Sequence, residues 1–194
     1  MKRTVPLAAF ALALASCLVS CDDHEHASDP ADPCSETGAW EKLAVTDEAC
    51  RAFVAAETRG EIVIDASKAP RLTNPTPGAI VPAAPVPRFT WSAGVVARTP
   101  WNRLLRALHP IGTAWAHGET IGLVHVLVFR DGAKKELHRV LTPATDYTPG
   151  AAHWERLRAA GKVEVTLYAV RFAANAIAAG TRPVGGEPQS FTIE

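Results

Sequence analysis

Residues 123–141 read LVHVLVFRDGAKKELHRVL, a mostly apolar run, an Asp131-Gly132 pair and a second stretch that returns along residues 136–141. Valine, leucine and phenylalanine fit the pleated, half-buried surface of a strand. An Asp-Gly pair between two such stretches is typical of a tight β-hairpin. This segment therefore predicts two antiparallel strands and a β-rich fold.

Three further stretches alternate between apolar and polar residues, which is the period of a half-buried strand. They are residues 89–92, 163–169 and 190–194. Prolines are dense between residues 70 and 87 and exclude a long helix there. Residues 69–194 are therefore predicted to form one mainly β domain with an antiparallel sheet.

Three further signals fit this order: residues 74–79 (NPTPGA), Phe89-Thr90-Trp91 with its core tryptophan, and residues 146–149 (DYTP) before the strand at 163–169. Together they resemble the pattern of an immunoglobulin-like or fibronectin type III domain. It implies an antiparallel β-sandwich over residues 69–194. It implies no particular activity, because such sandwiches carry many unrelated functions.

Two short helical insertions are expected in this sandwich. Thr99 and Pro100 can begin a helix to His109, and its apolar face would be formed by Trp101, Leu104, Leu105 and Leu108. That face either covers an open edge of the sandwich or binds a partner, and the sequence leaves both readings open. A second helix is predicted over residues 151–160, with Trp154 and Leu157 facing inward.

A small helical segment over residues 34–68 is predicted before the sandwich. Thr46 can cap a helix that ends near Gly60, and Cys50 lies on its apolar face. A disulfide between Cys34 and Cys50 would close a loop of about 16 residues and contribute on the order of 3 kcal/mol. The rival reading is a metal site with two thiol ligands, which an exported protein makes less favourable.

The N-terminus has the order of an export signal, with Lys2-Arg3, then an apolar run, then small residues beside cysteines. Leu18-Val19-Ser20-Cys21 resembles the bacterial lipoprotein signal, in which the cysteine receives lipid. Leu14-Ala15-Ser16-Cys17 fits the same pattern. Cys21 is favoured because acidic residues begin directly after it, and because its use leaves an even pair of cysteines.

This resemblance implies a signal peptide at residues 1–20 and a lipidated cysteine after it. The composition up to residue 33 is acidic, contains prolines and lacks large apolar residues, so the lipidated cysteine and a solvated tether are expected to span residues 21–33. The chain is then expected in the cell envelope, attached through lipid to a bacterial membrane and facing the periplasm or the exterior.

Charge and motifs exclude several function classes. Lysine plus arginine equal aspartate plus glutamate, 20 against 20, so no basic surface argues for nucleic-acid binding. The sequence has no nucleophile elbow, phosphate loop, dinucleotide fingerprint or zinc-protease helix, and Gly185-Gly186 is read as a turn. We therefore predict a non-catalytic binding or structural module without a cofactor, and its partner would be an envelope protein or polymer.

Histidines offer an alternative function. If Asp131 and Gly132 were the two central residues of the hairpin, His125 would lie opposite His138, where two imidazoles could hold zinc or copper. The competing reading of His125 is a core residue hydrogen-bonded to the backbone. His24 and His26 could bind a metal weakly in the tether.

Overall fold

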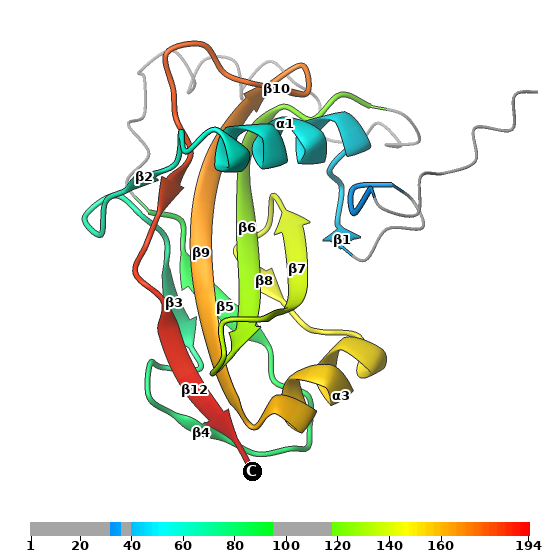
Figure 1. Ribbon diagram of the computed structural model, residues 1–194, viewed down its shortest axis with the longest axis vertical. Coiled ribbons are helices and arrows are strands. Elements are labelled where there is room, and N and C mark those ends of the chain that lie inside the picture. The colour runs from blue at the N-terminus through cyan, green and yellow to red at the C-terminus, as the bar shows by residue number, and fades with distance from the viewer. Residues whose placement is uncertain (1–31, 36–39, 95–117) are drawn as a thin grey trace, which may run out of the picture.

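The computed structural model describes residues 32–35, 40–94 and 118–194 (Figure 1). Its helices and strands are, in chain order, β1 (Glu41–Lys42), α1 (Asp47–Thr58), β2 (Val63–Ile64), β3 (Arg71–Asn74), β4 (Ile80–Val81), β5 (Phe89–Ser92), β6 (Gly122–Asp131), β7 (Glu136–Thr142), β8 (Asp146–Tyr147), α3 (Ala151–Ala160), β9 (Lys162–Ala173), β10 (Ala176–Ile177), β11 (Val184–Gly185) and β12 (Gln189–Ile193). The prediction of a mainly β fold is confirmed.

Two sheets and one helix form three layers. The central sheet has the order β1-β7-β6-β9-β11-β2, with β10 and β12 also paired to β9 and β4 paired to β12. The second sheet has the order β3-β5-β8. Figure 1 shows α1 across one face of the central sheet and the three-stranded sheet behind its other face. The core is therefore divided into two apolar clusters, one on each side of β6 and β9.

The central strand β6 is apolar on both faces because both faces are covered. Leu127 and Phe129 face the small sheet, where the ring of Phe129 meets Phe89 edge to face at 5.3 Å. Val126 faces the other way and belongs to the same cluster as Phe53 of α1. A strand buried on two faces reads as an almost continuous apolar run, which explains the lack of alternation in this part of the hairpin.

The long strands pair antiparallel as predicted, but the central sheet is mixed and not wholly antiparallel. Three pairs are parallel, namely β1 with β7, β2 with β11 and β4 with β12. Each of β1, β2 and β4 is two residues long and adds to a strand far along the chain, so no hairpin sets its direction. The helix α1 also supplies a third layer, which the predicted two-layer sandwich does not have.

Both predicted helices that fall in the described ranges are confirmed. The Thr46 hydroxyl caps α1 by accepting from the Ala49 amide at 3.2 Å. In α3, Trp154 and Leu157 are buried, and the Trp154 indole donates to the Ala83 carbonyl at 2.8 Å. The helix predicted over residues 100–109 lies outside the described residues.

The turn between β6 and β7 is longer than predicted. The Asp131 amide donates to the Lys135 carbonyl and the Lys134 amide to the Asp131 carbonyl, each at 3.0 Å, so the loop is residues 132–134. Lys134 has a φ of 67°, as the third residue of such a loop often does. A bulge near Phe129 adds to the shift, and His138 lies opposite Phe129 rather than His125.

Gly185 lies in β11 and not in the predicted turn, and a side chain there should destabilise the fold. A Cβ on Gly185 would lie 2.7 Å from the Tyr168 ring and 3.0 Å from Ile64 Cδ1. We expect Gly185→Ala to lower the free energy of unfolding by about 1–3 kcal/mol, the usual cost of overpacking. Urea denaturation measures this change.

Gly132 provides the matched control, because a Cβ there would have no atom within 4 Å. Gly132→Ala should change the free energy of unfolding by less than about 0.5 kcal/mol. Equal effects of the two substitutions would contradict the close packing of Gly185 against Tyr168.

Candidate functional site

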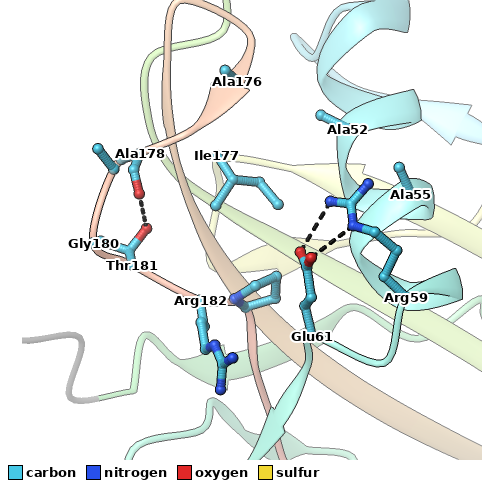
Figure 2. Close-up of a pocket in the computed structure, with 12 residues that line it drawn as sticks. Ala52, Ala55, Arg59, Glu61, Ala176, Ile177, Ala178, Gly180, Thr181 and Arg182 are labelled. Carbon is cyan, nitrogen blue, oxygen red and sulfur yellow. Dashed lines mark hydrogen bonds and ion pairs between the residues drawn. The ribbon is translucent and has the colours of Figure 1, made fainter.

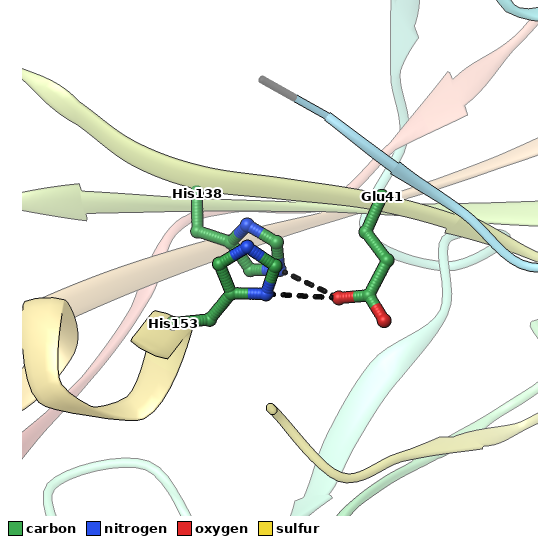
Figure 3. A group of neighbouring side chains, drawn as sticks. All are labelled: Glu41, His138 and His153. Atoms are coloured by element: carbon green, nitrogen blue, oxygen red, sulfur yellow. Dashed lines mark hydrogen bonds and ion pairs between the residues drawn. The ribbon is translucent and has the colours of Figure 1, made fainter. Parts of the chain in front are cut away.

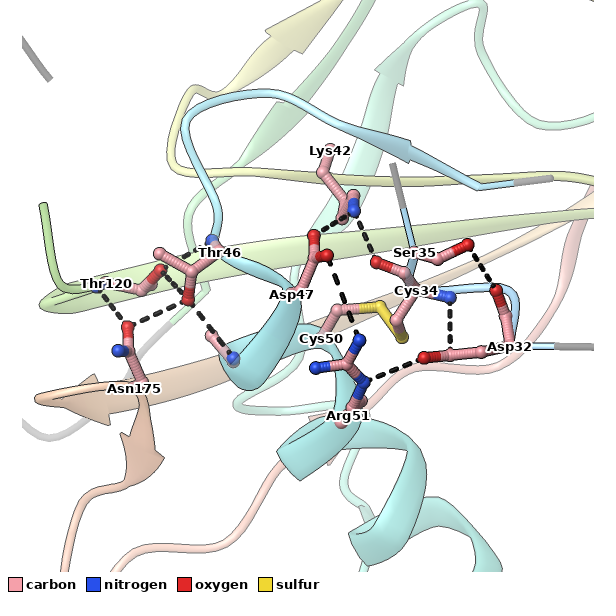
Figure 4. A network of polar contacts seen from close by, with 11 residues as sticks. Asp32, Cys34, Ser35, Lys42, Thr46, Asp47, Cys50, Arg51, Thr120 and Asn175 are labelled. Carbon is pink, nitrogen blue, oxygen red and sulfur yellow. Dashed lines mark hydrogen bonds and ion pairs between the residues drawn. A yellow bond between two sulfur atoms is a disulfide. The ribbon is translucent and has the colours of Figure 1, made fainter. Parts of the chain in front are cut away.

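The end of the predicted tether, described from Asp32, runs into Cys34, which a disulfide attaches to α1 (Figure 4). Cys34 and Cys50 are joined, with their Cα atoms 5.7 Å apart. Beside them, Asp32 accepts from the Cys34 amide at 2.9 Å and from the Arg51 guanidinium at 2.8 Å. Lys42 donates to the Cys34 carbonyl and to Asp47. These contacts hold the chain on both sides of the disulfide against the first turn of α1.

A second group of contacts holds α1 to the sheet. The Thr46 amide donates to the Thr120 hydroxyl at 2.9 Å, and the Thr46 hydroxyl donates to Asn175 Oδ1 at 2.8 Å (Figure 4). Asn175 also accepts from the Thr120 amide at 2.6 Å. The same residue that caps α1 therefore fixes the helix to the chain before β6 and to the turn after β9.

The strand β1 lies between Cys34 and α1 in the sequence and forms one edge of the central sheet, where it places Glu41. It pairs in parallel with β7, with Glu41 opposite Val140, and the Leu43 amide donates to the Leu141 carbonyl at 2.9 Å. This pairing is only two residues long. The Glu41 side chain adds hydrogen bonds from β1 to Tyr147 of β8 and His153 of α3.

Glu41 meets three aromatic side chains, and we call the four residues Glu41, His138, Tyr147 and His153 the Glu41 cluster. They come from β1, β7, β8 and α3. Figure 3 shows both imidazoles directed toward the same carboxylate oxygen, with His153 Nδ1 at 3.1 Å and His138 Nε2 at 3.4 Å from Glu41 Oε2. The two rings are stacked, with centroids 3.9 Å apart.

Tyr147 connects the carboxylate and the buried histidine. Its hydroxyl donates to Glu41 Oε2 at 2.6 Å and lies 2.8 Å from His138 Nε2. Burial raises the pKa of Tyr147, and the hydrogen bond to Glu41 and its negative charge raise the pKa further. The phenol therefore keeps its proton and can donate it to Glu41 at neutral pH.

His138 is neutral in this environment. Burial is the main cause that lowers the pKa of His138 to about 3, and electrostatic contributions from His153 and Arg156 act in the same direction. Its ring is stacked on Phe129 at a centroid distance of 5.9 Å, and its Nδ1 atom has no hydrogen-bond partner in the described structure. A neutral, held imidazole is the form that binds a metal ion.

The cluster has the donor atoms of a transition-metal site. One ligand atom each from Glu41, His138 and His153 lie within 4.8 Å of one another. Two imidazole nitrogens and one carboxylate oxygen form a ligand set that zinc accepts in proteins. Without a metal ion, the same residues form a hydrogen-bonded group that joins β1 to β7, β8 and α3.

The predicted pair of His125 and His138 is wrong. His125 lies opposite Thr142, four residues along β6 from the partner of His138, which is about 13 Å at 3.3 Å per residue. His125 Nδ1 is bonded to the Ala144 carbonyl at 2.8 Å, and its ring meets Trp91 edge to face. His125 is therefore a core histidine bonded to backbone, as the competing reading proposed.

A groove of about 460 Å³ lies between α1 and the loop after β10 (Figure 2). Alanines and Ile177 form much of its lining. Its acid is already paired, since Arg59 Nε donates to Glu61 at 2.6 Å. The other charged side chain in the lining is Arg182, and one guanidinium near an acid that is already paired does not argue for chemistry. The Glu41 cluster is therefore the stronger candidate.

The remaining predicted site residues cannot be placed in this fold. Cys21, Cys17 and the apolar face of Trp101, Leu104, Leu105 and Leu108 lie outside the described residues. Sequence reasoning missed Glu41, used Tyr147 only as part of the immunoglobulin-like pattern, and gave His153 no role. No local pattern points to these residues, because they are brought together only by the fold.

No protein-family model, curated protein or solved structure matches this chain. In the described ranges, neither helix is long and apolar enough to cross a membrane.

Proposed function

We propose that this chain is a lipoprotein of the bacterial cell envelope, attached to a membrane through Cys21, whose β domain is a non-catalytic binding or structural module. Its partner would be another envelope protein or a polymer. The Cys34–Cys50 disulfide supports export, since disulfides persist mainly in oxidising compartments. The lipoprotein signal in the sequence supports the anchor.

The structural observation that supports this proposal is the way in which the residues after the tether are attached to the domain. The disulfide joins them to α1, and the Glu41 cluster joins β1 to β7, β8 and α3. The folded domain would then begin directly where the tether ends. A tether of about a dozen extended residues would hold the domain up to about 40 Å from the bilayer, at roughly 3.3 Å per residue.

The immunoglobulin-like identity of the domain belongs to the same proposal. Two sheets that enclose Trp91 of β5 support it, since such sandwiches bury a tryptophan between their sheets. The parallel edge strands and the helix α1 are departures from that pattern. The proposal therefore concerns the two-sheet core and assigns no activity.

Lipid labelling tests the anchor. We expect the full chain, expressed in a bacterium and supplied with an alkyne-tagged fatty acid, to be labelled and to sediment with membranes. Cys21→Ser should abolish the label and release the protein from the membrane fraction, because the acceptor thiol is lost. Cys17→Ser is the matched control and should leave the label in place. Loss of the label in Cys17→Ser alone would move the anchor to Cys17, and an unlabelled wild-type chain would contradict the proposal.

A further inference from the structure

We infer that Glu41, His138 and His153 form a binding site for a zinc ion. This inference goes beyond the proposed role in the envelope and does not depend on the lipid anchor. It rests on the distances between ligand atoms, on the burial of one histidine and on the partial exposure of the other two ligands.

The distances fit a tetrahedral ion. Zinc–nitrogen and zinc–oxygen bonds of about 2.0–2.1 Å place neighbouring ligand atoms about 3.3 Å apart in a tetrahedron. Glu41 Oε2 lies 3.1 Å from His153 Nδ1 and 3.4 Å from His138 Nε2. Two of the three edges between ligand atoms are thus already close to the required length, and all three ligand atoms lie within 4.8 Å of one another.

The surroundings of the ligands also suit a metal ion. His138 is held by Phe129 on one side and by His153 on the other, so its ring is oriented before an ion arrives. Tyr147 donates to Glu41, and ligating carboxylates usually have such a hydrogen-bond partner. Because the Tyr147 hydroxyl donates to Glu41, His138 Nε2 donates its proton to the phenol oxygen in the metal-free site. When zinc binds, this proton would move to His138 Nδ1, and the lone pair freed on Nε2 would bind the ion.

The exposure of the other two ligands gives an entry path. The side chains of Glu41 and His153 are 27% and 26% exposed, whereas that of His138 is fully buried. An ion can therefore reach the carboxylate and His153 from solvent and then contact His138. Water can fill the fourth position, as in zinc sites with three protein ligands.

The charges around the site limit its affinity. Glu41 brings one negative charge, and the two imidazole ligands bring none. We therefore expect weaker binding than in structural zinc sites built from thiolates, with one ion per chain.

Calorimetry with zinc chloride on the purified, chelator-treated full chain tests the inference. The starting chain carries His24→Gln and His26→Gln, which removes the histidines of the predicted tether. One zinc ion should bind per chain, and cobalt in its place should give the visible absorption of tetrahedral Co²⁺. Glu41→Gln and His153→Gln should each lower the affinity by at least about tenfold.

The control is Glu155→Gln, which removes an exposed carboxylate from the same helix as His153. It should leave the affinity unchanged. Glu41 and His153 are partly exposed, so both variants are expected to fold, and circular dichroism verifies this. No binding to the starting chain, or binding that Glu41→Gln and His153→Gln leave unchanged, would overturn the zinc site and leave the cluster as a hydrogen-bonded group only.

Discussion

Reduction of the Cys34–Cys50 disulfide is expected to lower the free energy of unfolding by about 3 kcal/mol, the value for a loop of this length. The sequence separation is 16 residues, so the bond removes many conformations from the unfolded chain. Both cysteines are fully buried beside Phe53 in the cluster under α1, so reduction also leaves two thiols in a tightly packed core. Urea denaturation with and without reductant measures the loss.

The Cys34→Ala/Cys50→Ala double variant distinguishes the effect of losing the disulfide from any other effect of the reductant on stability. It should be as unstable in the absence of reductant as the reduced wild type, and reductant should not change it further. A loss below about 1 kcal/mol in both experiments would show that the remaining contacts of Asp32 and Lys42 hold this segment without the disulfide.

Acid is expected to destabilise the fold well before the carboxylates titrate. The pKa of His138 is about 3 in the folded protein against 6.5 as its ordinary value. Below pH 6.5 the unfolded chain therefore binds a proton that the folded chain does not, and stability falls as the pH falls toward 3. At about 1.4 kcal/mol per pH unit, His138 costs roughly 2 kcal/mol between pH 7 and pH 5. Burial also lowers the pKa of His125, which adds in the same direction.

The slope of stability against pH tests this account of His138. His138→Phe keeps an aromatic ring between Phe129 and His153 but removes the titrating group, so its stability should change much less between pH 7 and pH 5. The imidazole resonances of His138 in the wild type should also show no titration above pH 5. An NMR pKa near 6.5 would contradict the buried, neutral state of this histidine.

Much of the sheet could be predicted because its signals are local. Alternation of apolar and polar residues can be read directly from the sequence in three strands, at residues 89–92, 163–169 and 190–194. The helix α3 can be read from its inward-facing apolar residues and its end signal. The third layer could not be predicted in the same way. The apolar run in β6 indicates burial, but only the packing of Phe53 against its second face shows that α1 covers it.

The candidate site could not be predicted, for two physical reasons. Glu41 is 106 residues from Tyr147 and 112 from His153, so no spacing along the chain relates them. The hairpin register depends on a loop at residues 132–134 and on one bulge. Together they place His138 opposite Phe129, which is four residues along β6 from the predicted partner His125. A small error in a turn is thus enough to pair the wrong histidine.

Hydrogen exchange at the Leu43 amide tests most directly whether the Glu41 cluster holds β1 to the domain. This amide is bonded to the Leu141 carbonyl beside the cluster. We predict that Glu41→Ala speeds its exchange by at least about tenfold, which corresponds to about 1.4 kcal/mol of local stability. Glu155→Ala, which removes only an exposed ion pair with Arg158, should leave it unchanged. Unchanged exchange in Glu41→Ala would show that β1 is held without the cluster and would contradict the account.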